Sequence, residues 1–161
     1  MTVAGIRRVA VVGTGVIGAS WAALFLARGL EVVATDPSPG AEDRLRADVG
    51  AHWAVLDPVE GASPGRLVFT PDPADAVRGA DWVQENGPER EDVKHALFAV
   101  LDAAARPGVV LASSSSGLLP SAIARGCPQH PERVVIGHPF NPPHLIPLVE
   151  VVPGERTSAE A

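Results

Sequence analysis

The chain has 161 residues, of which 46% are hydrophobic, a formal net charge of −6 and a pI of about 5.3. This length fits one domain with a substantial core. An acidic chain without a basic run argues against nucleic acid as a partner. No apolar run approaches the roughly 18 residues that span a bilayer, so we expect no membrane partner. The N-terminus leaves no room for a signal peptide and the lone cysteine, Cys127, cannot form an internal disulfide, so we expect a cytoplasmic protein.

A glycine-rich turn follows the first apolar run. Val9–Val12 is β-branched and apolar, which is typical of a strand buried on both faces. The motif G-x-G-x-x-G follows, with Gly13, Gly15 and Gly18, and it leads into an apolar helix expected at Val16–Arg28. In a strand–turn–helix of this kind the three glycines allow the tight turn, the approach of a pyrophosphate, and close packing of helix on strand. The helix N-terminus then faces the anion.

An acidic residue at the end of the next strand supports this interpretation. Glu31–Thr35 is the second predicted strand, and Asp36 follows it, 18 residues after Gly18. The spacing fits a carboxylate that binds the ribose 2′-hydroxyl of a dinucleotide, and no arginine is present nearby for a 2′-phosphate. NAD is therefore predicted over NADP, with FAD as a weaker alternative. The cofactor-binding residues predicted from this stretch are Gly13, Gly15, Ile17, Gly18 and Asp36.

The rest of the chain alternates between helical and strand patterns. Helices are predicted at Ala41–Leu56, Pro73–Val77 and Glu91–Ala105, a loop at Pro58–Gly65, and strands at Leu67–Thr70, Asp81–Glu85, Val109–Ala112, Arg133–Gly137 and Leu148–Val152. Alternation of this kind predicts an α/β fold with a doubly wound, mostly parallel sheet of the Rossmann type.

Ligands of such sheets bind where the strands end. We expect that edge to collect Gly13–Gly18, Asp36, Asn86–Glu89, Ser113–Ser116 and His138. Glu150 lies in an apolar strand twelve residues after His138, where an unpaired carboxylate is costly. A His–Glu pair would act as a general base, with a nearby NAD accepting a hydride. In the alternative interpretation His138 caps a strand and Glu150 faces solvent on an edge strand.

Three other residue types narrow the chemistry. The chain has no tyrosine, which excludes a Tyr/Lys proton relay, and Lys94 is its lone lysine beside twelve arginines. Cys127 is expected to be a small loop residue rather than a nucleophile. The remaining histidines are expected on the surface or in loops, without the spacing of metal ligands, so no metal is predicted. They are His52, His95, His130 and His144.

Two longer segments resemble a known family. They are SSSSGLLPSAIA, from Ser113, and ERVVIGHPFNPPHLIPLVEVVPG, from Glu132. They are similar to the NAD-binding domain of the L-3-hydroxyacyl-CoA dehydrogenase superfamily, within the branch of L-carnitine dehydrogenase and L-gulonate 3-dehydrogenase (the lambda-crystallin group). The resemblance runs from Val9 to about Gly154. It implies NAD-dependent oxidation of an L-3-hydroxyacyl group or a 3-hydroxy acid to the 3-oxo product.

The resemblance also implies roles for individual residues. His138 corresponds to the catalytic base, Glu150 to its partner carboxylate, and Ser116 to a serine that contacts substrate and nicotinamide. The positions that correspond to further cofactor contacts are Glu89, Lys94 and Asn141.

Two departures from the family pattern qualify these implications. Acyl-CoA-specific members carry a lysine-rich helical hairpin after the second strand, whereas Pro37–Gly65 has no lysine, which favours a small free 3-hydroxy acid over an acyl-CoA. The family's C-terminal helical domain, which forms a homodimer, has no counterpart here. We therefore expect an NAD-binding domain over residues 1–154, with 155–161 as the start of a linker. The capping box formed by Thr157 and Glu160 predicts the start of a helix. The alternative function is a non-catalytic NAD-binding or structural module.

Overall fold

The computed structural model describes residues 5–161, so the first four residues of the predicted domain lie outside it. The strands are β1 (Arg8–Val12), β2 (Glu31–Thr35), β3 (Leu67–Phe69), β4 (Trp82–Glu85), β5 (Val110–Ser113), β6 (Val134–Pro139) and β7 (Val149–Pro153). The α-helices are α1 (Val16–Ala27), α2 (Ala41–Trp53), α3 (Pro73–Arg78), α4 (Glu91–Ala104) and α5 (Pro120–Ile123). Short 3₁₀ turns occupy Pro64–Arg66, Ala124–Gly126 and Pro131–Arg133.

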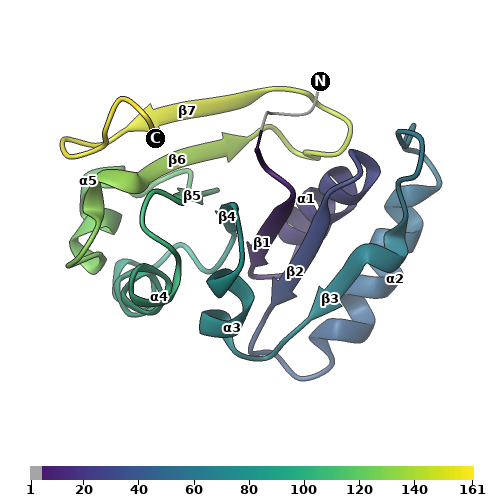
Figure 1. Cartoon of the computed structure of the whole chain (residues 1–161), viewed down its shortest axis with the longest axis horizontal. Coiled ribbons are helices and arrows are strands. Elements are labelled where there is room, and N and C mark those ends of the chain that lie inside the picture. The colour runs from purple at the N-terminus through teal and green to yellow at the C-terminus, as the bar shows by residue number, and fades with distance from the viewer. Residues whose placement is uncertain (1–4) are drawn as a thin grey trace.

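The strands form one sheet in the order β3-β2-β1-β4-β5-β6-β7 (Figure 1). Neighbouring strands from β3 to β6 pair in parallel, and β7 runs antiparallel to β6. From β1 the chain first adds β2 and β3 on one side and then returns to add β4 to β7 on the other side. This change of direction is the hallmark of a doubly wound sheet. The predicted Rossmann-type fold is confirmed. The seven predicted strands and the helices α1 to α4 agree with the observed ones to within a few residues, and α5 was not predicted.

Each face of the sheet has its own hydrophobic core. Val9 and Val32 of β1 and β2 pack against α1 and α2 together with Leu45. On the opposite face, β4 and β5 pack against α3 and α4, where Phe98 and Leu101 are fully buried. Successive side chains of a strand point to opposite faces of the sheet, and those of β1 are apolar. β1 therefore contributes to both cores.

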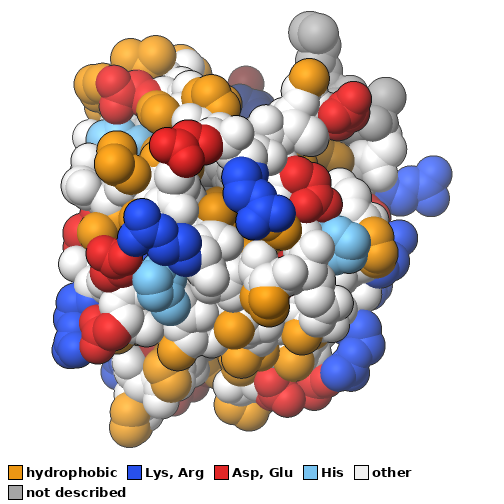
Figure 2. All heavy atoms as spheres, turned by 90° about the vertical axis from the view of Figure 1, so that its left-hand side faces the viewer, with side chains coloured by type: hydrophobic (Ala, Val, Ile, Leu, Met, Phe, Trp, Pro, Cys, Tyr) orange, Lys and Arg blue, Asp and Glu red, His pale blue; other side chains and the backbone are white. Residues whose placement is uncertain are grey.

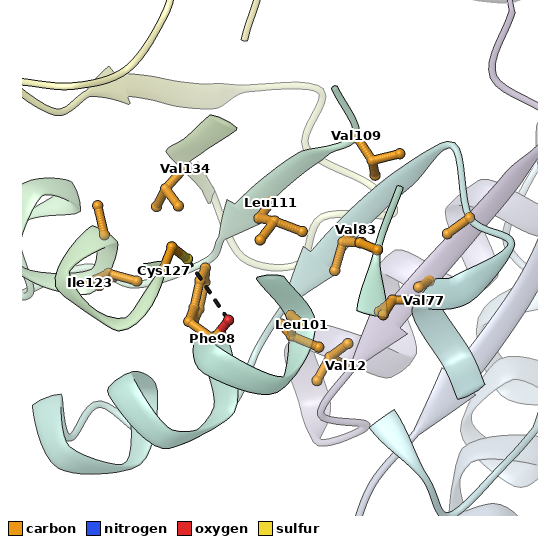
Figure 3. Packing of buried hydrophobic residues seen from close by; sticks show 14 of the residues in the cluster. Val12, Val77, Val83, Phe98, Leu101, Val109, Leu111, Ile123, Cys127 and Val134 are labelled. Atoms are coloured by element: carbon orange, nitrogen blue, oxygen red, sulfur yellow. Dashed lines mark hydrogen bonds between the residues drawn. The ribbon is translucent and has the colours of Figure 1, made fainter. Parts of the chain in front are cut away.

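Cys127 belongs to the second of these cores. Its thiol lies among Phe98, Leu111, Ile123 and Val134, and its Sγ is 3.8 Å from the Phe98 carbonyl oxygen (Figure 3). Burial raises the pKa of the Cys127 thiol to about 12, and the negative charge of a nearby aspartate adds to this effect. Cys127 lies in a loop, as predicted, and is more deeply buried than expected, at 2% exposed. A thiol of raised pKa in such surroundings is a poor nucleophile at neutral pH.

The last strand lies at the edge of the sheet. All five residues of β7 are exposed, and the strand is held by its ladder to β6. After it, the chain folds back on the domain, where the backbone N–H of Glu155 donates to Ser121 Oγ (2.9 Å) and that of Ser158 to the Glu132 carbonyl (2.8 Å).

No helical turn forms in residues 158–161, the four residues that follow Thr157 here, so the helix start predicted from the capping box stays a prediction. The Thr157 hydroxyl has other partners: it accepts a hydrogen bond from the Gly154 N–H (2.7 Å) and donates one to the Val134 carbonyl (2.7 Å).

One face of the molecule is mixed in charge. Figure 2 shows basic and acidic side chains interspersed on the side of the molecule bordered by α4, α5 and β7, with neither charge dominating. In the part of the chain that the structure describes, no helix is long and apolar enough to cross a membrane.

Candidate active site

The glycine turn between β1 and α1 is shaped by close backbone contacts. Gly13 has a φ of +85°, and a Cβ there would lie 2.9 Å from the backbone of Asn86. A Cβ at Gly18 would lie 1.9 Å from the Gly13 carbonyl oxygen. These two positions need glycine for the fold itself, because L side chains rarely adopt such a φ and no atom fits at such a distance.

Gly15 differs from its two neighbours in the motif. A Cβ at this position would meet no described atom within 4 Å, so the space beside it is open. It is also the N-cap of α1, and among residues 5–161 no side chain hydrogen-bonds to this helix end. The first N–H groups of α1 and its positive dipole end therefore remain available to an anion. Ile17, in the first turn, is half-buried.

Asp36 lies directly beside this turn. Its carboxylate accepts hydrogen bonds from the backbone N–H groups of Thr14 (2.8 Å) and Ser38 (2.9 Å). Partial burial acts to raise the pKa of the Asp36 carboxyl, but these hydrogen bonds outweigh it and hold the pKa below its usual value. Asp36 is thus ionised at neutral pH and held next to the open glycine. An uncapped helix N-terminus, an open glycine and an ionised aspartate at the end of β2 fit a dinucleotide with a free ribose 2′-hydroxyl.

His138 and Glu150 meet across the last two strands. They are directly opposite partners in the antiparallel pairing of β6 and β7, and His138 Nδ1 lies 2.8 Å from Glu150 Oε2. The carboxylate thereby favours the imidazole tautomer that carries its proton on Nδ1. The predicted pairing of these two side chains is confirmed. Glu150 nevertheless keeps 58% of its side chain exposed on the edge strand, as the alternative interpretation expected for its position.

A run of side-chain hydrogen bonds connects the glycine turn to the strand that carries the histidine. Asn86 Nδ2 lies 3.4 Å from the Gly13 carbonyl, and the Ser114 hydroxyl donates to Asn86 Oδ1 (2.7 Å). Ser114 accepts in turn from Gln84 Nε2 (2.9 Å), which also donates to the Gly137 carbonyl (3.2 Å). The run follows the ends of β1, β4, β5 and β6, so the predicted edge of the sheet does collect these segments.

A buried ion pair lies at the end of β4, next to this edge of the sheet. Glu85 and Lys94 are 0% and 1% exposed, and Lys94 Nζ donates to both Glu85 oxygens (2.8 and 2.7 Å) and to the Gly87 carbonyl (3.1 Å). The Ser113 hydroxyl donates to Glu85 Oε2 (2.6 Å). Sequence reasoning missed Glu85, although an acidic residue ending an apolar strand was a possible signal. Lys94 is turned inward in this structure, and its contact with the cofactor stays a prediction.

Glu89 holds the loop that follows β5. Its Oε1 accepts hydrogen bonds from the Ser115 hydroxyl and from the backbone N–H groups of Gly117 (2.7 Å) and Leu118 (3.0 Å). Partial burial acts to raise the pKa of the Glu89 carboxyl, but these donors together lower it. Ser116 is exposed in this loop, and Asn141 is exposed after β6. The substrate and cofactor contacts assigned to Ser116, Asn141 and Glu89 stay predictions.

His144 lies in a loop, as predicted, but it is buried there. Its ring packs 4.0 Å from that of His52 and its Nδ1 lies 2.7 Å from Ser20 Oγ. His95 bonds to the Ala122 carbonyl (2.8 Å). In residues 5–161 no group of three or more His, Cys, Asp or Glu side chains could hold a metal ion.

Fold and site together define a dinucleotide-binding Rossmann domain with a histidine–carboxylate pair at its ligand edge. A match to the family described as "3-hydroxyacyl-CoA dehydrogenase, NAD binding domain" covers residues 8–161. The chain belongs to this family, and its cofactor is NAD. The resemblance found in the sequence is thereby confirmed.

Several proteins of known name are similar to this chain. The L-carnitine dehydrogenase of Streptomyces coelicolor is 56% identical over 159 residues, which cover 97% of this chain and 50% of that protein. The 3-hydroxyacyl-CoA dehydrogenase of Gibberella moniliformis is 53% identical over 161 residues, or 97% and 49% of the two chains. Among solved structures, 3-hydroxybutyryl-CoA dehydrogenase from Escherichia coli K12 matches with a TM-score of 0.83 at 36% identity and covers 97% of this chain and 34% of its own. The chain spans about half the length of the curated relatives it matches.

Proposed function

We propose that the chain serves an NAD-dependent dehydrogenase that oxidises the 3-hydroxy group of a small 3-hydroxy acid, with L-carnitine as the first candidate. The observation that carries the proposal is the His138–Glu150 pair, at the same edge of the sheet as the open Gly15 and the ionised Asp36. A proton acceptor and a dinucleotide site at one edge are what the oxidation of an alcohol requires.

Three residues of the chain have separate roles in the proposed oxidation. Glu150 accepts a hydrogen bond from the Nδ1–H of His138 and orients the ring, which leaves Nε2 to accept the proton of a substrate hydroxyl. The negative charge of Glu150 then stabilises the imidazolium that forms. Ser116, exposed in the neighbouring loop, donates a hydrogen bond to the reacting oxygen. NAD bound at the glycine turn would supply the acceptor for the hydride that leaves the carbon carrying this oxygen.

The preference for a free acid over an acyl-CoA rests on the segment after β2. CoA phosphates require clustered positive charge. Here Arg46 is paired with Glu42 (2.7 Å) and Arg44 bonds to the Pro39 carbonyl (2.8 Å), so the arginines of α2 are already engaged. The identity to L-carnitine dehydrogenases supports the same choice. A cytoplasmic location, supported by the one buried cysteine, and a homodimer of the complete protein are part of the proposal.

The test is a substrate panel. The complete gene product is assayed with NAD against L-carnitine, L-gulonate, 3-hydroxybutyrate and 3-hydroxybutyryl-CoA, with NADH followed by absorbance. We expect turnover with L-carnitine, and we expect His138→Gln to lower kcat by about 10²- to 10⁴-fold while NAD affinity stays unchanged. NAD binding without NADH formation from any member of the panel would favour the non-catalytic module instead. Near-normal turnover of His138→Gln would remove this residue from the mechanism.

A further inference from the structure

The loop between β6 and β7 carries a buried imidazole that the proposed reaction does not use. His144 lies in the middle of the loop Phe140–Leu148, and two hydrogen bonds join it to a single hydroxyl of α1. Its Nδ1 is 2.7 Å from Ser20 Oγ, and its backbone N–H donates to the same oxygen (3.0 Å). Ser20 is 1% exposed and His144 9%, so water competes little for this contact.

The loop is also braced on its other sides. The N–H groups of Leu145 and Ile146 both donate to the Pro142 carbonyl (3.0 Å each), which closes a tight turn around the histidine. The His144 ring packs against the ring of His52 from α2, with 4.0 Å between centroids. Burial lowers the pKa of the His144 imidazole, and a positive charge on His52 would lower it further. His144 is thus held as a neutral ring between α1 and α2.

This contact restrains the strand that carries Glu150. β7 is exposed along its whole length and pairs with β6 at the edge of the sheet, so it has little packing of its own. Beyond its ladder it is fixed at its far end, where Thr157 bonds to the Val134 carbonyl (2.7 Å). At its near end the loop is tied to α1 through Ser20 and His144.

We propose that Ser20 and His144 are positioning residues, which set the place of Glu150 against His138 relative to α1. α1 is the helix that begins at the nucleotide turn, with Ser20 five residues after Gly15. The contact therefore joins the element that receives the cofactor to the loop that brings the carboxylate to the base. This inference rests on the proposed function of the His138–Glu150 pair.

The test uses the chain itself and two variants that remove the contact in different ways. Ser20→Ala deletes the hydroxyl, and His144→Phe keeps an aromatic ring beside His52 but has no ring nitrogen. The half-buried His130, which pairs with Glu132 (3.1 Å) away from this loop, provides the control His130→Phe. Two readouts are taken: amide hydrogen exchange, and the imidazole ¹⁵N shifts of His138 at a pH where the ring is neutral.

We expect exchange at Leu145 and Leu148 to rise about fivefold or more in both variants, the range expected for loss of a buried hydrogen bond. Exchange at Phe98 and Leu101 in α4, which report the global stability, should rise by a smaller factor. The His138 ¹⁵N shifts should move from a ring protonated on Nδ1 toward an average of the two tautomers. The control should leave all of these signals unchanged.

The double variant provides a further check. Because Ser20→Ala and His144→Phe remove the same contact, together they should raise exchange no more than about twofold beyond either alone. Loop exchange and His138 shifts equal to those of the control would overturn the inference, and so would full additivity. None of these readouts depends on turnover, so this failure is distinct from normal activity of His138→Gln, which would refute the proposed function.

Discussion

Gly15→Ala and Gly18→Ala are two equally small changes in one motif, and the structure predicts opposite effects for them. The first should weaken NAD binding and leave the fold intact. The second should destabilise the fold. The difference follows from the space around each glycine, because a Cβ at Gly15 meets no described atom within 4 Å whereas one at Gly18 would lie 1.9 Å from the Gly13 carbonyl oxygen.

The expected sizes can be worked out from these contacts. At Gly18 the turn must shift to admit the methyl group, and overpacking of this kind costs about 3 kcal/mol. For a chain of this length that corresponds to a fall in Tm of about 6–12 °C. At Gly15 the backbone has φ −65° and ψ −168°, which is extended and open to alanine. The stabilisation by a stiffer unfolded chain and the loss of a good N-cap residue are each below about 1 kcal/mol and offset one another.

For NAD affinity, the substitution at Gly15 is expected to have the direct effect. The methyl of Gly15→Ala occupies the space that the pyrophosphate must approach, so NAD affinity should fall at least about tenfold, or about 1.4 kcal/mol. Calorimetric unfolding and NAD titration of the two variants and the parent chain give both quantities. Normal NAD affinity of Gly15→Ala would show that the pyrophosphate does not bind at this turn. An unchanged Tm for Gly18→Ala would show that the packing of α1 on the turn is described wrongly.

Four further outcomes are expected. Asp36→Ala should weaken NAD binding by about 10- to 100-fold and reduce the discrimination against NADP, both measured by titration, because the ribose loses a hydrogen bond to a charged group; unchanged selectivity would contradict the role of this carboxylate. In the complete protein Glu150→Gln should lower kcat about 10²-fold, less than the roughly 10⁴-fold typical of a buried carboxylate, because Glu150 is half exposed. Native Cys127 should react with iodoacetamide about 10³-fold more slowly than a free thiol, since its pKa is about 12; rapid mass labelling would refute its burial. Because the folded-state pKa of His144 is lowered, the unfolded chain takes up its proton first as the pH falls, so the free energy of unfolding should decrease below about pH 6.5, and urea titrations should show a smaller decrease in His144→Phe.

The fold was predictable because its determinants are local. Short β-branched runs, a glycine motif and helices ended by Pro or Gly specify strands and helices in alternation, and the alternation specifies a parallel sheet. The same logic brought His138 and Glu150 together, since four prolines between them make a compact connection and an unpaired carboxylate in an apolar strand is costly.

The parts that sequence reasoning missed depend on contacts between distant segments. Glu85 gained its role from Lys94 and Ser113 on neighbouring elements, and no local pattern records that three such groups will be buried together. The burial of His144 within its loop was not predicted, because its partner, Ser20, is 124 residues away. Thr157 carries a capping signal, but its hydroxyl also donates to the strand carbonyl of Val134, a partner 23 residues away that no local pattern records.

The antiparallel return of β7 has a consequence for how this site tolerates change. His138 and Glu150 meet because they are cross-strand partners, and side chains of a strand alternate between the two sides of a sheet. A shift of β7 against β6 by a single residue would turn the carboxylate to the opposite side of the sheet while leaving every amino acid of the pair in place. The pairing register of the two strands is therefore as necessary to the proton acceptor as the identity of its side chains.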